Sequence, residues 1–481
     1  MADTLFFYDL ETSGFSPREQ RIMQFGGQRT DMQLKPLGEP HNYFIRLGED
    51  VLPDPDAVLL TGITPQKTIS EGLTEAEFLR IFYKDIAAAG TIFVGFNSIR
   101  FDDEFMRFLH YRNFYDAYEW HWSDGRSRWD LLDVTRMTRA LRPDGIKWPV
   151  DSEGKAANRL GLLTAMNGLN HTNAHDALSD VQATIALAQL LKSKQPKLFD
   201  YLLGMRDKKK VAALVESGQP FVYTSGKYAS EHEKTTVVTR LTGHPKKTGA
   251  LVYDLRHDPA PFLSMPAAKL AELWQHYCKD RPCTHQRLPV KTLQYNRCPA
   301  VAPLSVLDPS CQQRLGLSMD DIAAHAASLK TAAAFTERLL EALQLLDKQQ
   351  QARLLSDESD VDSRLYDGFV GDKDKTAMRA VRAASVEELA TQRFSFQDDR
   401  LSALLPLYKA RNFPHSLSDE ERTVWERFRE RKLTGGKAAS RAARYFERLG
   451  QLAEQRDISG EQRYLLEELQ LYGQSILPAG D

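Results

Sequence analysis

Residues 4–14 read TLFFYDLETSG and place two acids at the end of an apolar run. The run Thr4–Leu10 is rich in aromatic side chains and predicts a buried β-strand. Because side chains alternate along a strand with a period of two, the carboxylates of Asp9 and Glu11 project from the same face. Their apolar neighbours put this pair at a dry edge of the core, where two like charges are costly unless a cation joins them.

A third acid, Asp102, begins a predicted helix shortly after a predicted strand at residues 91–97. Taken alone, the acid pair on the first strand and the acid at the helix start each have a simpler explanation. The pair on the first strand fits two solvent-facing acids at a strand end, and an acid at a helix start favours the helix dipole. A functional site therefore requires further groups.

The segment NAHDALSDVQAT (residues 173–184) supplies these further groups. If Asp176 caps the helix that follows, Asp180 lies in the first turn and His175 lies just outside the helix. Positions five apart in a regular helix face different ways, so His175 and Asp180 converge only if His175 belongs to the preceding loop. The capping pattern predicts that placement.

Together these residues predict a metal-dependent phosphoryl-transfer site. Four carboxylates around one cleft suit two divalent cations, and hard oxygen ligands favour Mg²⁺, with Mn²⁺ as a substitute. Two ions about 3.5–4 Å apart can hold the attacking and leaving oxygens of an in-line displacement. An imidazole titrates near neutral pH, so His175 is placed to take the proton of the attacking water. The predicted ligands are Asp9, Glu11, Asp102 and Asp180.

The surrounding segments predict an α/β domain. We expect strands at residues 4–10, 21–30, 41–47 and 91–97, and helices at 73–89, 101–112, 129–141 and 177–194. This order describes a mixed sheet with helices, and Pro196 marks the end of the domain. Residues 196–350 contain short β-rich runs and appended helices, and residues 351–481 are polar and helical. The predicted domains are therefore 1–195, 196–350 and 351–481.

Length and composition exclude several classes of protein. At roughly 100–200 residues per domain, 481 residues suggest about three domains. A net charge of −2 excludes a uniformly basic nucleic-acid coat. The sequence predicts no signal peptide and no membrane span, and the 4 cysteines do not suggest a disulfide framework, which fits a reducing cytoplasm. Without a C-x-x-C pair, a zinc site among these cysteines is not expected.

The motifs DLETSG, FNSIRFDDEF and HDALSDV resemble those of the DEDD superfamily of 3′→5′ exonucleases, in the branch with a histidine base. This resemblance implies a ribonuclease-H-like fold. Longer segments, at residues 95–149, 173–202 and 408–414, resemble bacterial exodeoxyribonuclease I. That family implies an SH3-like middle domain and a helical C-terminal domain, which help to close a channel around single-stranded DNA. It also implies processive release of 5′-mononucleotides and a role in DNA repair and recombination in the bacterial cytoplasm.

Between Arg100 and Arg159, arginines alternate with aromatic residues, as single-stranded DNA binding requires. We expect about half of these residues to have structural roles instead, with several aromatics in the core and several arginines in ion pairs only. The resemblance implies strand contacts by Arg107, Tyr118, Trp122, Arg128 and Arg136, and a phosphate contact by Arg159. Glu11 and Thr12 are expected beside the terminal nucleotide.

The same family binds the acidic, apolar-tipped tail of single-strand-binding protein. Such a tail requires a basic rim beside an apolar pocket, and Arg142 and Tyr201 lie in the matching segments. We expect a monomer that does not bind membranes. Two other functions stay open: an exoribonuclease of the same superfamily, which would share every catalytic residue, and a non-catalytic nucleic-acid-binding scaffold.

Overall fold

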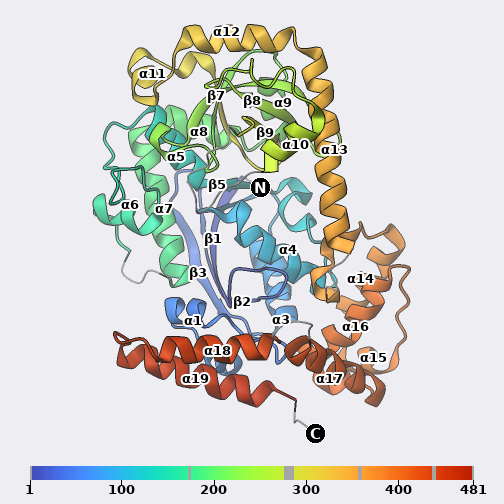
Figure 1. Cartoon of the computed structure of the whole chain (residues 1–481). Helices are drawn as coiled ribbons and strands as arrows, with labels where there is room; N and C mark the ends of the chain where they lie inside the picture. The colour runs from blue at the N-terminus through green and yellow to red at the C-terminus, as the bar shows by residue number, and fades with distance from the viewer. Residues whose placement is uncertain (1–2, 172–174, 276–286, 356–359, 436–439, 479–481) are drawn as a thin grey trace. The chain divides into compact units, whose positions relative to one another are not determined.

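The strand that carries Asp9 and Glu11 lies at the centre of a five-stranded sheet in the computed structural model (Figure 1). The strand order is β3-β2-β1-β4-β5, with β1 antiparallel to β2 and parallel to β4. The presence of both pairings confirms the predicted α/β class with a mixed sheet. The strands are β1 (Thr4–Thr12), β2 (Ile22–Thr30), β3 (Pro36–Phe44), β4 (Thr91–Gly95) and β5 (Ser127–Asp130).

The structure describes residues 3–171, 175–275, 287–355, 360–435 and 440–478. The chain divides into two units. Unit 1 comprises residues 1–128, 171–185 and 359–481, and unit 2 comprises residues 129–170 and 186–358. Unit 1 therefore joins the first and last parts of the chain, and it contains all the predicted catalytic residues.

Aromatic side chains from several elements form the core against the unit 1 sheet. Tyr8 on β1 stacks on Phe25 of β2 with 6.2 Å between the ring centroids, and Trp120 packs edge-on against Tyr8. The apolar run that predicted β1 is thus buried as expected. The helices of this part of the chain are α1 (Pro55–Thr61), α2 (Pro65–Glu71), α3 (Glu75–Ile81), α4 (Asp102–Arg112) and α7 (Ala177–Lys194).

Three local predictions differ from the structure. The third strand was expected at residues 41–47 but spans Pro36–Phe44, because this edge strand is mostly exposed and lacks the apolar alternation that marks a strand. The helix expected at 73–89 is shorter: a capping box at Thr74 starts α3, and a π-turn at Phe82–Ile86 ends it. The short elements α1, α2 and β5 were not predicted.

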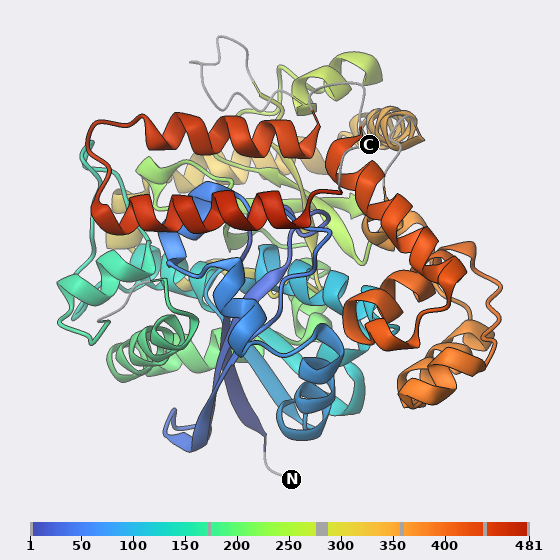
Figure 2. The ribbon, with the colours of Figure 1, turned by 90° about the horizontal axis from the view of Figure 1, so that it is seen from below.

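Helices α14 (Asp372–Ala383), α15 (Val386–Thr391), α16 (Asp399–Asn412), α17 (Asp419–Thr434), α18 (Arg441–Ala453) and α19 (Gly460–Ile476) form the C-terminal part of unit 1. Helices α18 and α19 lie side by side, as Figure 2 shows. The expected helical C-terminal segment is confirmed.

A buried ion cluster links this C-terminal part to the start of the chain. Arg411 on α16 bridges Asp50 and Asp362 at 2.8 and 2.7 Å, and Arg21 pairs with Asp362 at 2.8 Å. Lys432 on α17 pairs with Asp50. All five side chains are nearly inaccessible to solvent. Although burial alone would raise the pKa of Asp50, the charges of its cationic neighbours hold that pKa well below its usual value.

Unit 2 contains a second five-stranded sheet, in the order β10-β6-β7-β8-β9. Its strands are β6 (Phe221–Thr224), β7 (Thr235–Gly243), β8 (Gly249–Asp254), β9 (Val290–Gln294) and β10 (Ala300–Pro303). The helices are α5 (Leu131–Leu141), α6 (Leu160–Met166), α8 (Pro196–Gly204), α9 (Lys208–Val215), α10 (Ala267–Gln275), α11 (Pro309–Leu315), α12 (Met319–Lys330) and α13 (Ala333–Leu355). This content confirms the predicted β-rich segment with appended helices. Cys278 and Cys283 lie outside the described residues.

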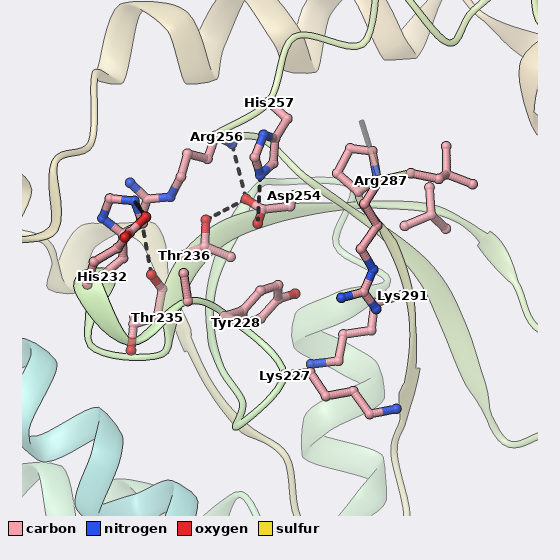
Figure 3. Close-up of a pocket in the computed structure, with 15 residues that line it drawn as sticks. Lys227, Tyr228, His232, Thr235, Thr236, Asp254, Arg256, His257, Arg287 and Lys291 are labelled. Atoms are coloured by element: carbon pink, nitrogen blue, oxygen red, sulfur yellow. Dashed lines mark hydrogen bonds and ion pairs between the residues drawn. The ribbon is translucent and has the colours of Figure 1, made fainter. Parts of the chain in front are cut away.

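A pocket of about 560 Å³ opens beside this second sheet. Figure 3 shows Tyr228 between Asp254 on one side and Lys291 on the other. The pocket contains none of the predicted catalytic residues, so it is distinct from the metal site predicted on β1. Among the described residues, no helix has the length and apolar character needed to cross a membrane.

Candidate metal centre and strand-contact residues

Strand β1 holds the first two acids at its C-terminal end, beside β2. Asp9 pairs in register with Gly26, and Glu11 pairs with Gln24. The Glu11 side chain is buried, and Asp9 is partly buried. The sheet therefore fixes two carboxylates at one edge of the aromatic core, as the period of two predicts.

The start of α7 docks on the β2 residues that lie opposite these acids. A Cβ atom on Gly26 would come within 2.5 Å of the Ala177 backbone, so only glycine allows this close approach. Gln24 donates to Asp176 Oδ2 at 2.9 Å and accepts from the Ala177 backbone N–H at 3.2 Å. Two residues of β2 thus bring the start of α7 close to Asp9 and Glu11, at the C-terminal end of β1.

Asp176 caps α7 as the sequence predicts. Its carboxylate accepts the Ser179 backbone N–H at 3.0 Å, and the helix begins at Ala177. His175 lies outside the helix, is exposed, and has a left-handed φ of 68°. This turn, and not the helix itself, directs the imidazole toward the acids.

Glu11, His175 and Asp180 meet at one point. Each offers one ligand atom, and these atoms lie within 4.8 Å of one another. The other two predicted residues lie nearby: Asp9 is on the same strand as Glu11, and Asp102 Oδ1 accepts the Leu10 backbone N–H at 3.2 Å. Carboxylate oxygens with one imidazole nitrogen are a donor set that fits a divalent cation.

The electrostatics of this site favour a bound cation. Burial, followed by the charges of Asp9 and Asp180, raises the pKa of Glu11 to about 9. The pKa of Asp9 is also raised well above its usual value, by burial and then by the charges of Asp102 and Asp180. Acids this close cannot all ionise cheaply, and a divalent cation would remove that repulsion.

Sequence reasoning missed a second histidine at the site. His171 Nε2 is hydrogen-bonded to Asp180 Oδ1. The two histidines are four residues apart in HTNAHD, and this repeat was the available signal. Residues 172–174 between them lie outside the described residues. Gln24 was also missed, because nothing in its local sequence indicates that it holds the α7 start.

The predicted strand contacts in unit 1 have different environments. Arg107 pairs with Glu104 and lies over the Tyr118 ring, 5.4 Å from its centroid. Trp122 is 58% exposed and presents an open ring surface. Arg128, by contrast, is buried and pairs with Asp103. Its guanidinium therefore already has a structural partner.

Unit 2 contains the remaining predicted contacts. Arg136 pairs with Asp133 at 2.7 Å, and Arg159 is exposed at the start of α6. Arg142 donates to the Val306 carbonyl at 3.1 Å, and Tyr201 is partly exposed.

Two further positions belong to unit 1. The Thr12 hydroxyl donates to the Gly14 carbonyl at 2.8 Å, so it supports the loop after Glu11. Phe369, which the sequence reasoning did not name, is 93% exposed in the segment LYDGFVGD.

Three families match successive parts of the chain. The Exonuclease family matches residues 6–188, the Exonuclease I SH3-like domain matches 206–344, and the Exonuclease I C-terminal domain matches 359–476. These matches confirm the expected order of an exonuclease domain, an SH3-like domain and a helical C-terminal domain.

Exodeoxyribonuclease I of Haemophilus influenzae is 36% identical over 98% of this chain and 99% of its own length. Exonuclease I from Methylocaldum szegediense matches with a TM-score of 0.92 and 41% identity, over 99% of this chain and 100% of that one. E. coli exonuclease I in complex with a dA16 oligonucleotide matches with a TM-score of 0.92 and 36% identity, with the same coverage.

A further solved structure, of SSB and exonuclease I in complex with the inhibitor CFAM, has a TM-score of 0.88 and 34% identity to this chain, over 99% of this chain and 100% of that one. Identity above 30% over nearly the full length, together with the three matched domains, establishes the family. The chain belongs to the exodeoxyribonuclease I family of hydrolases.

Proposed function

We propose that this chain is an exonuclease that removes 5′-mononucleotides from the 3′ end of single-stranded DNA. The observation that carries the proposal is the meeting of Glu11, His175 and Asp180, whose ligand atoms lie within 4.8 Å of one another. Asp9 and Asp102 add two carboxylates beside them. Family membership supports the same reaction, and the oligonucleotide in the matching E. coli structure supports the same substrate.

The cofactor in this proposal is a pair of Mg²⁺ ions, which Mn²⁺ can replace, held by Asp9, Glu11, Asp102 and Asp180. When bound, the ions polarise the phosphate and hold the attacking and leaving oxygens. His175 takes the proton of the attacking water at a ring nitrogen, and its exposed position lets that proton pass to solvent. Gln24 holds the α7 start, and with it Asp180, against β2.

Strand binding is assigned to cations and open aromatic rings. In unit 1 we propose Arg107, Tyr118, Trp122 and Arg128, together with Glu11 and Thr12 at the terminal nucleotide. Arg128 would have to share its charge between Asp103 and a phosphate. Arg136 and Arg159 are the proposed contacts of unit 2.

Three further points belong to the same proposal. Digestion is processive and serves DNA repair and recombination. The partner is single-strand-binding protein, which the structure of SSB with a related exonuclease I supports. Its tail binds at Arg142 and Tyr201. The protein is a bacterial cytoplasmic monomer, with domains at 1–195, 196–350 and 351–481.

One assay tests the reaction. DNA and RNA oligonucleotides, single- and double-stranded and labelled at either end, are incubated with Mg²⁺, with and without a chelator. We expect mononucleotides only from single-stranded DNA, only from its 3′ end and only with metal. Equal digestion of RNA would instead identify an exoribonuclease. No release from any strand would favour a non-catalytic scaffold, although the shared position of three ligand groups argues against it.

A further inference from the structure

Phe15 lies four residues after Glu11 and exposes 72% of its surface. Single exposed apolar residues are ordinary on protein surfaces, so exposure alone does not indicate a function. Two other features distinguish Phe15: its loop is fixed, and its ring lies at the junction that holds the catalytic acids.

Hydrogen bonds and close packing fix the loop. Ser13 exchanges bonds with Arg21, donating its backbone N–H to the Arg21 carbonyl at 2.9 Å and accepting the Arg21 N–H at 2.8 Å. The Ser13 carbonyl accepts the Asp54 N–H at 2.6 Å. Gly14 has a φ of 153°, and a Cβ atom there would lie 2.9 Å from the Gln20 side chain. These contacts fix the backbone that carries Phe15.

The ring of Phe15 meets Phe101, with 6.4 Å between their centroids and an angle of 63° between their planes. Phe101 immediately precedes Asp102 and packs on Phe105, 5.1 Å away. Asp102 accepts the backbone N–H of Leu10, which lies between Asp9 and Glu11. The rings of Phe15 and Phe101 therefore lie at the junction of β1 and α4, where these acids also lie.

We propose that Phe15 is a specificity-determining residue whose ring stacks on the base of the 3′-terminal nucleotide. This inference rests on the proposed function and adds to it the element that recognises the strand end. A phosphate held at the acids places its own base one sugar away, at the mouth of the site. The supported, outward ring of Phe15 offers that base a flat apolar surface.

Stacking on Phe15 selects for unpaired ends. A terminal base inside a duplex is held by its partner and its neighbour, so reaching the ring requires fraying. Purines stack on a flat ring more strongly than pyrimidines, so the contribution of Phe15 is larger at purine ends. The ring touches the base and not the reacting atoms, and its loss therefore affects binding more than turnover.

The first test compares Phe15→Ala, Phe15→Trp and Leu471→Ala. Leu471 is 60% exposed on α19 and serves as the control. kcat and KM are measured on single strands that end in a purine or a pyrimidine. We expect Phe15→Ala to raise KM about tenfold at purine ends and less at pyrimidine ends, with kcat changed less than about twofold. Phe15→Trp restores the wild-type values, and Leu471→Ala leaves them unchanged.

The second test observes stacking directly, without turnover. A strand with 2-aminopurine at its 3′ end is bound to Asp9→Ala protein and to the Asp9→Ala, Phe15→Ala double variant. Stacking on Phe15 quenches the fluorescence in the first protein only. Equal quenching in both, or a KM for Phe15→Ala equal to that of wild type, overturns the inference.

The two proposals fail differently. If wild-type protein digests no strand, the exonuclease proposal is wrong, while the fluorescence measurement still decides where a strand end binds. If wild-type protein digests DNA and Phe15→Ala behaves identically, only the role of Phe15 is wrong. Unfolding temperatures confirm that the substitution leaves the fold intact, and Phe15→Leu replaces it if Phe15→Ala does not fold.

Discussion

Leu10 donates its backbone N–H to Asp102 at 3.2 Å, so the residue between Asp9 and Glu11 also fixes the third acid. The next residue, Asp103, points elsewhere: it accepts the Tyr8 hydroxyl and pairs with buried Arg128. Asp102 and Asp103, which are consecutive at the start of α4, therefore make different contacts: Asp102 with the β1 backbone, and Asp103 with Tyr8 and Arg128.

Substitutions of these neighbours are expected to separate activity from stability. Asp102→Asn removes a proposed metal ligand, and we expect turnover to fall by more than about 100-fold with the unfolding temperature maintained in chelator. Asp103→Asn leaves the Arg128 charge buried without its anionic partner and costs about 3–5 kcal/mol of unfolding free energy. Nuclease assays and denaturant unfolding of both variants measure this contrast. Similar losses of stability in the two would contradict it.

His175→Ala tests the proposed base. Removal of a positioned general base lowers turnover by about 10²–10⁴-fold, and the limb of the pH–rate profile that reports deprotonation of the imidazole should disappear. Calorimetric Mg²⁺ binding should persist, because the carboxylates remain. An unchanged pH–rate profile would remove His175 from this role. His171→Ala is the comparison variant: it removes the other histidine of this segment and leaves His175 in place, so this limb of the pH–rate profile should remain.

The raised pKa of Glu11 predicts proton release when metal binds. With a pKa of about 9, this carboxyl holds a proton near neutral pH in the metal-free protein. Mg²⁺ must displace the proton, so its affinity should rise with pH up to about 9. Calorimetry in buffers of different ionisation enthalpy counts the protons released. Glu11→Gln should release fewer, and a pH-independent affinity would count against the assignment.

The raised pKa of Glu11 also makes the free energy of unfolding depend on pH. The folded state keeps a proton on Glu11 that the unfolded chain releases near its ordinary pKa of 4.5. In chelator, the unfolding free energy contributed by this group therefore falls as pH rises through the window from 4.5 to about 9. Thermal unfolding across that range, with Glu11→Gln as the comparison, measures the effect. Added Mg²⁺ should flatten the slope.

Asp362→Asn is expected to destabilise unit 1 strongly. The substitution leaves Arg21, Arg411 and Lys432 with Asp50 as their remaining anion in the cluster, and losses of this kind cost about 3–5 kcal/mol. Although burial opposes it, the charges of Arg411 and Lys432 lower the pKa of Asp362, so its stabilisation is present above pH about 4 and is lost as pH falls. Urea unfolding at pH 7 measures the cost of the substitution, and unfolding at pH 2 measures how much of the stabilisation is lost in acid. A cost below about 1 kcal/mol at pH 7 would contradict the prediction.

Local chemistry predicted the elements that carry the acids. The aromatic run predicted β1, the Asp176 cap predicted the start of α7, and Asp102 was correctly placed at the start of α4. Prediction failed where an element depends on distant neighbours. Exposed β3 exists because β2 pairs with it, and α1 and α2 are too short for a clear period.

The candidate site also combines residues that the local sequence predicted with residues whose roles depend on distant neighbours. The residue types and their order predicted the acids and His175, and the structure brings Glu11, His175 and Asp180 together. The roles of Gln24 and Gly26 could not be predicted, because each depends on the backbone of a helix some 150 positions later. Partners that pair across such distances leave no local pattern in the sequence.

The ion cluster around Asp50 and Asp362 has a consequence for any attempt to shorten this protein. Arg21 pairs with Asp362 and is hydrogen-bonded to Ser13, so the loop beside the proposed metal ligands is braced by Asp362, some 340 residues later in the chain. Removing the chain from α16 onward would take away Arg411 and Lys432, leave Arg21 as the remaining cation beside Asp50 and Asp362, and loosen that brace. A shortened version of this protein would therefore need new partners for Arg21, so that the loop beside Glu11 keeps its position.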